Sequence, residues 1–179
     1  MGGMLGALVG SFAPAGGSFE SIATATGTGS SDTITFSSIP STYKHLQIRG
    51  IANDTAGFEA SLVLNGDTAG NYVYHRLLGN GSTASATGSV GDSWIRIGNS
   101  GSTADTFATY IIDIQDYTST TRNKTTRTFT GRDLNGSGSA SLYSGLWLST
   151  SAVTSVSIVN VGARSWTSTT TFALYGIKG

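Results

Sequence analysis

The chain has 179 residues, of which 38% are hydrophobic and only 11% are charged, well below the charged fraction of about 25% in typical soluble domains. Its formal net charge is zero, which argues against nucleic acids and anionic membrane surfaces as partners, because both require a basic field. The sequence contains no cysteine, which excludes disulfide scaffolds, thiolate metal sites and a cysteine nucleophile. A neutral, hydroxyl-rich surface favours association with other protein chains instead.

Residues 1–17 form an apolar, glycine-rich segment that carries no charged side chain and so lacks the basic start of a signal peptide. Large apolar side chains in such a segment favour contact with a partner surface. We therefore predict an extended N-terminal arm that docks on another chain; the alternative is an arm that folds back on its own domain. The predicted partner-binding residues are Met4, Leu5, Leu8, Val9 and Phe12.

After the arm, short runs that alternate apolar and polar residues follow one another, separated by clusters of Gly, Asn, Asp and Ser. This period of two predicts β-strands. Asn65-Gly66-Asp67 predicts a turn, because Asn and Gly tolerate positive φ. The predicted strands in this half of the chain are 19–26, 32–39, 44–52, 58–64 and 71–78.

The second half begins with residues 79–91, which we expect to form a long polar loop. The segment 107–117 is the strongest predicted strand, with Tyr110, Ile112 and Ile114 on one face. The Thr-rich segment 124–129 is expected to lie at a sheet edge. The other predicted strands are 94–97, 142–148, 153–161 and 169–177.

This pattern of roughly ten or eleven short strands, with turn signals every ~8–12 residues, is typical of a sandwich. No helical stripe of useful length interrupts it. We therefore predict an all-β fold, an antiparallel two-sheet β-sandwich that is jelly-roll-like and spans residues 18–179, with the extended N-terminal arm over 1–17.

Residues that could carry chemistry do not form a recognisable motif. His45 and His75 lie inside separate predicted strands, and no close-spaced ligand supports a metal site. Asp113 and Asp116 fall on opposite faces if their strand continues, which is poor geometry for paired acid and base catalysis. Asn65, Asp67 and Asn71 cluster in one loop, which turn chemistry explains better than calcium binding. We expect no catalytic residue, no cofactor and no metal ligand.

The tryptophans Trp94, Trp147 and Trp166, together with the tyrosines, could form a sugar-stacking platform. Trp166 stands between polar residues and is the tryptophan that we expect to be exposed, which makes it the candidate glycan contact. The alternative is that these aromatic side chains pack in the core or at an interface.

Several strand ends and turns resemble a group of tailed-bacteriophage structural proteins, over about residues 19–179. The matching stretches are 19–23, 34–36, 39–48, 64–72 and 172–179. The resemblance implies residence in a virion, on the capsid shell or in the tail, and it carries over no catalytic residue.

We therefore expect a non-enzymatic virion structural protein, assembled in the bacterial host cytoplasm. The leading hypothesis is a homotrimeric cement or decoration protein that binds the major capsid protein or other virion proteins and stabilises the assembled shell. The alternative is a tail-fibre or receptor-binding module that recognises host surface glycans. Neither hypothesis involves nucleic acid or membrane.

Overall fold

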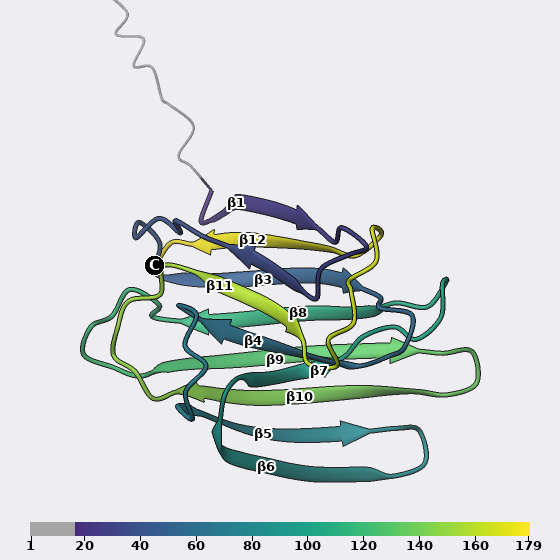
Figure 1. The fold of residues 1–179 in the computed structure, drawn as a ribbon. Helices are drawn as coiled ribbons and strands as arrows, with labels where there is room; N and C mark the ends of the chain where they lie inside the picture. The colour runs from purple at the N-terminus through teal and green to yellow at the C-terminus, as the bar shows by residue number, and fades with distance from the viewer. Residues whose placement is uncertain (1–16) are drawn as a thin grey trace, which may run out of the picture.

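Two antiparallel β-sheets pack face to face in the computed structural model, which describes residues 17–179. The predicted two-sheet β-sandwich is therefore confirmed (Figure 1). The large sheet contains, in spatial order, β1 (Phe19–Thr26), β12 (Thr171–Ile177), β3 (His45–Ala52), β8 (Ala108–Gln115), β9 (Lys124–Asp133), β10 (Gly138–Trp147), β5 (Tyr72–Gly79) and β6 (Ala84–Asp92). The small sheet contains β2 (Thr33–Phe36), β11 (Val156–Asn160), β4 (Glu59–Leu64) and β7 (Ile95–Asn99).

The chain passes from one sheet to the other at most of its connections, which is the jelly-roll-like feature of the topology. The exceptions are the hairpin of β5 with β6 and the consecutive strands β8, β9 and β10, which stay in the large sheet. As a result, the sheet neighbours of β3 are β12 and β8, both distant from it in sequence.

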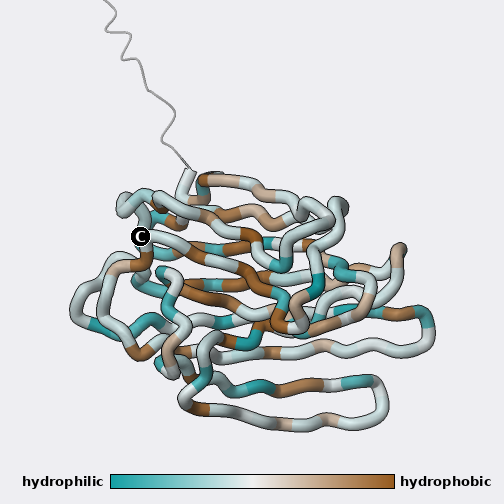
Figure 2. Tube along the Cα trace, viewed as in Figure 1, coloured by the Kyte–Doolittle hydropathy of each residue, from teal (hydrophilic) through white to brown (hydrophobic). Residues whose placement is uncertain are grey.

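The core lies between the sheets and follows from the period of two. In β8, Tyr110, Ile112 and Ile114 are buried on the inner face, as predicted, whereas Ile111 points to the opposite face and is exposed. Figure 2 shows hydrophobic residues gathered along the central strands. The turn predicted at Asn65 is also confirmed, since Asn65 and Gly66 both have positive φ, of 52° and 68°.

The prediction of a long polar loop over 79–91 is wrong. Most of this segment is β6, which pairs with β5 from Tyr72 to Gly79 through a turn at residues 80–83. Most of its residues are small or hydroxyl-bearing and exposed, and Val90 is its one large apolar residue, so the alternation that marks a strand is absent from the sequence. The strand forms because its backbone pairs with that of β5, which an edge strand can do without contributing to the core.

The expectation that 124–129 is an edge strand is also wrong. This segment begins β9, which lies between β8 and β10 in the middle of the large sheet. Thr126, Thr128 and Thr130 point inward and are buried. Threonine is β-branched and fits a pleated, covered surface, so a hydroxyl-rich sequence does not by itself indicate an edge.

Candidate functional site

The small sheet covers one face of the large sheet, and the opposite face, called the outer face below, bears most of the exposed large apolar side chains. Strand alternation directs these side chains away from the core. They are Phe19, Ile51, Leu77, Val90, Ile111, Phe129 and Leu142. An uncovered apolar surface of this kind is the usual mark of an interaction site.

Four of these residues, together with Ala86, form a continuous row across five adjacent strands. Strand register pairs Ile111 with Phe129, Phe129 with Leu142, Leu142 with Leu77, and Leu77 with Ala86. We call this row the apolar ladder. Phe129 is 53% exposed, Leu142 54% and Leu77 60%. The ladder forms the floor of a groove of about 790 Å³, and a second hollow of about 530 Å³ adjoins it over β5, β6 and β10.

A row of hydrogen-bonding side chains runs beside the ladder on the same outer face, two residues away from the ladder along each strand. It consists of Gln47, Asp113, Arg127, Ser144 and His75, which register places side by side on consecutive strands. We call it the polar row. The Gln47 amide donates to Asp113 Oδ1 at 2.8 Å, and Arg127 Nη1 donates to Ser144 Oγ at 3.0 Å. The negative charge of Asp113 and the positive charge of Arg127 cancel, so this row suits an uncharged partner.

Together, the two rows can hold a protein segment. Apolar side chains can pack on the ladder, while backbone N–H and C=O groups of the same segment can bond to the polar row. Of the side chains in the ladder, only Phe129 is aromatic. The groove therefore offers an aliphatic floor rather than a stacking platform.

An aromatic cluster stands on the outer face at the other side of the sheet. Phe19 of β1 stacks on Tyr175 of β12 with ring centroids 4.7 Å apart, and the Arg49 guanidinium lies 5.4 Å from the centre of the Phe19 ring. Arg49 pairs with Ile111 in register, so it stands at the end of the apolar ladder. The cluster closes the ladder on the side of the N-terminus.

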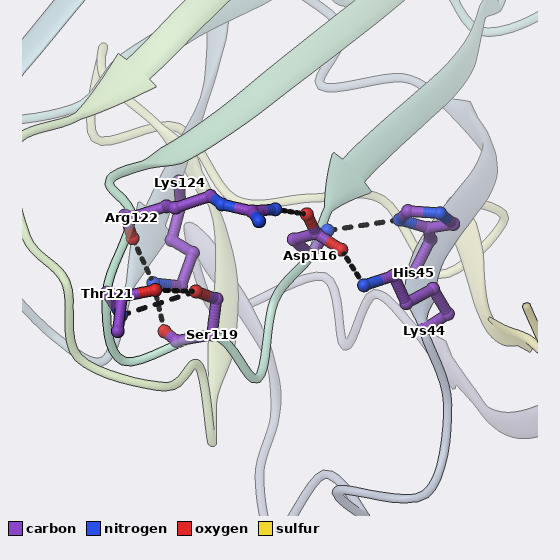
Figure 3. A network of polar contacts seen from close by, with 7 residues as sticks. All are labelled: Lys44, His45, Asp116, Ser119, Thr121, Arg122 and Lys124. Atoms are coloured by element: carbon purple, nitrogen blue, oxygen red, sulfur yellow. Dashed lines mark hydrogen bonds and ion pairs between the residues drawn. The ribbon is translucent and has the colours of Figure 1, made fainter.

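The acidic residues considered as catalytic candidates do not meet. Asp113 belongs to the polar row, whereas Asp116 follows the end of β8 and forms ion pairs with Lys44 at 2.5 Å and Arg122 at 2.7 Å (Figure 3). The hydrogen bond and charge of Lys44, with the charge of Arg122, hold the pKa of Asp116 below its ordinary value. Both ion pairs are those of a surface carboxylate and give no sign of acid or base catalysis.

The two histidines are also apart. His45 lies in β3 and accepts a hydrogen bond at Nδ1 from the Asp116 amide, at 3.0 Å (Figure 3). His75 lies in β5, in the polar row, with three strands between them. Within residues 17–179, no group of three or more acidic or histidine side chains is close enough to hold a metal ion. Asp67 accepts hydrogen bonds from Asn71 and from Trp147 Nε1, at 2.9 and 2.7 Å, so it braces the turn.

The expectation that Trp166 is exposed is wrong. Its side chain is completely buried, packs edge-on against Phe172 at 6.0 Å and donates from Nε1 to the Ile158 carbonyl at 3.4 Å. Trp166 could contact a glycan only if the core opened. The predicted partner-binding residues of the arm lie outside the described residues; they are Met4, Leu5, Leu8, Val9 and Phe12.

Sequence reasoning missed the apolar ladder. The available signal was the pair of adjacent apolar residues within one alternating strand, as in Ile111-Ile112 and Leu77-Leu78. Such pairs place an apolar side chain on each face of a strand. That such side chains form one row with Phe129 and Ala86 depends on strand register, which no single segment encodes.

No family model matches this chain, and neither a curated protein nor a solved structure matches it. In the part of the chain that the structure describes, no helix is long and apolar enough to cross a membrane.

Proposed function

We propose that this chain is a non-catalytic structural protein of a tailed-phage virion that binds other virion subunits through the outer face of its large sheet. The observation that carries the proposal is the apolar ladder, an uncovered apolar row across five strands at the floor of a groove of about 790 Å³. Covering it with a partner removes apolar area from water, at about 25 cal/mol per Å².

Two further features support an assembly role. The net charge of zero imposes no long-range repulsion between copies or between the chain and a shell. The strand-end and turn motifs resemble those of tailed-phage structural proteins, which supports a virion as the site of action. A cement protein bound to the assembled shell would stabilise it by mass action, because it binds the assembled state and not the free subunits.

A glycan-binding tail-fibre module is supported less well. Sugar recognition typically combines aromatic faces with converging hydrogen-bonding groups. The ladder has one aromatic ring, that of Phe129, and Trp166 is buried in the core. The aliphatic floor favours a protein segment, so we propose a protein partner for the groove.

Replacing Leu142 by Glu tests the proposal, with Leu148→Glu as a matched control. Leu142 is 54% exposed in the ladder, and Leu148 is 49% exposed just beyond β10 and outside the groove. A buried leucine contact is worth about 1.5–3 kcal/mol, so we expect Leu142→Glu to lower incorporation into gradient-purified particles at least about tenfold. The control should be incorporated normally, and both variants should keep the melting temperature of the native chain.

The same experiment counts copies of the native chain per particle by quantitative mass spectrometry. Hundreds of copies indicate the shell and a few dozen or fewer indicate the tail. Absence of the native chain from purified particles contradicts the virion proposal. Equal incorporation of the two glutamate variants contradicts the assignment of the groove as the docking surface.

A further inference from the structure

The groove has the length and chemistry to receive a short uncharged segment. Neighbouring strands are about 4.8 Å apart, so a ladder across five strands is about 19 Å long. Its floor is apolar, and the polar row beside it presents both donors and acceptors, namely the side chains of Arg127, Ser144 and Asp113. An occupant should therefore be apolar in its side chains, carry no charge, and offer backbone groups to the polar row.

Residues 1–16 of this chain meet those requirements. They contain no charged side chain, and their five large apolar residues other than Met1 fall within 4–12. Extended at about 3.3 Å per residue, that stretch is about 30 Å long, which spans the ladder with some length to spare. Glycine and alanine at most of the intervening positions leave room for a close approach to the sheet.

The start of β1 indicates which groove the segment can enter. Phe19 pairs with Ile177, and the Lys178 amide then donates to the Ser18 carbonyl at 2.9 Å. The backbone therefore stays in the plane of the sheet to the sheet's end. Glu20 holds this end through an ion pair with Lys178 and a hydrogen bond from the Tyr43 hydroxyl at 3.1 Å.

A return to the chain's own ladder meets an obstacle. The segment precedes β1, so it would have to turn back at the start of β1 and cross the outer faces of β12 and β3. The stacked rings of Phe19 and Tyr175, with Arg49 above them, stand on that route. A groove on a neighbouring molecule requires neither the reversal nor the crossing.

We infer that residues 4–12 of one copy bind in the groove of a second copy, with Met4, Leu8 and Phe12, which share one face of an extended segment, on the ladder and the backbone along the polar row. The inference rests on the outer face being the docking surface proposed above, and it names the partner as another molecule of this chain. The contact is heterologous, so repeating it generates a closed ring or an open chain of subunits. A closed ring of three would match the homotrimer expected from the sequence.

Because the chain has no cysteine, single engineered cysteines can report on this contact. We would purify Leu8→Cys and Leu77→Cys full-length proteins separately, mix them and add a short bis-maleimide. Leu77 is 60% exposed in the ladder. We expect a cross-linked heterodimer, and we expect Leu142→Glu added to the Leu77→Cys protein to reduce its yield about tenfold or more. Mixing Leu8→Cys with Leu148→Cys, outside the groove, should give little product.

The outcomes separate this inference from the proposed function. A double variant, Leu8→Cys with Leu77→Cys in one chain, tests the alternative. If the cross-link forms only within this double variant and never between the two single-cysteine proteins, then the arm occupies its own groove and the inference is overturned. Absence of any cross-link also overturns it, and if Leu142→Glu still blocks particle incorporation, then another virion protein occupies the groove. If the cross-linked heterodimer forms but the native chain is absent from purified particles, then the arm contact is supported and the virion role is contradicted.

Discussion

Replacing Asp54 by Ala should lower the free energy of unfolding by about 3 kcal/mol or more, because it removes the acceptor for several buried donors at once. Asp54 is 4% exposed and follows the end of β3. Its carboxylate accepts the amides of Ala56 at 2.9 Å, Gly57 at 2.6 Å and Phe58 at 3.1 Å. It also accepts a hydrogen bond from the Asn160 side chain of β11. One carboxylate thus orders the connection from β3 to β4 and ties it to a neighbouring strand.

The measurement is denaturant unfolding of the two proteins, with Asp54→Asn as the control of similar size. For a domain of this length the expected loss corresponds to about 6–12 °C in Tm. Asp54→Asn keeps one carbonyl acceptor, so its free energy of unfolding should fall by less than that of Asp54→Ala. If the alanine variant is as stable as the native protein, then water satisfies these donors and the carboxylate does not order the connection.

The pH dependence of the native protein gives an independent check on Asp54. Burial alone would raise the pKa of this carboxyl, but hydrogen bonds from Asn160 and from the amides of Ala56 and Gly57 outweigh burial and lower the pKa below its ordinary value. The unfolded chain therefore binds the proton at a higher pH than the folded chain does. The stabilisation by Asp54 is complete above the unfolded pKa and is lost as the pH falls through the folded pKa, so the difference between native and Asp54→Ala proteins should shrink there.

Alternation alone was enough to predict the sandwich, because residues two apart share a face of a strand whichever sheet it joins. The strand β1 was predicted with its observed bounds, 19–26, and the buried face of β8 was predicted residue by residue. Strand order is a different matter, because β3 finds its partners in β12 and β8, far along the sequence. The groove depends on the pairing of β10 with β5, which are also far apart in the sequence, and local patterns therefore could not reveal it.

Hydroxyl-rich composition caused the main errors. Trp166 follows Arg164-Ser165 and precedes Thr167, which indicates an exposed loop, yet its ring fills the core while polar backbone groups around it find partners. For example, the Trp166 amide donates to the Ser31 carbonyl at 2.8 Å. Burial of an aromatic side chain is set by the sheets above and below it, and its immediate neighbours carry little information about them.

Replacing Lys124 by Met should also cost about 3 kcal/mol of unfolding free energy, although the side chain keeps most of its length. Lys124 opens β9 and is completely buried. Its ammonium donates to the carbonyls of Ser119 at 2.7 Å and Arg122 at 2.8 Å (Figure 3), and to the carbonyl of Thr150 at 3.1 Å. These carbonyls belong to the connection between β8 and β9 and to the segment after β10, so one ammonium links two connections at the same end of the sandwich.

Lys44→Met is the matched control for Lys124→Met, because it makes the same change at a lysine that pairs with Asp116 in the same network (Figure 3). The Lys44 side chain is 53% exposed, and solvent screens its ion pair, so we expect little change in Tm. Thermal unfolding of both variants beside the native protein makes the comparison. Methionine cannot donate a hydrogen bond, and three carbonyls would have to find water or remain unpaired. Equal Tm values for the two variants would mean that water replaces the ammonium without loss, and that the hydrogen bonds of Lys124 do not stabilise this end of the fold.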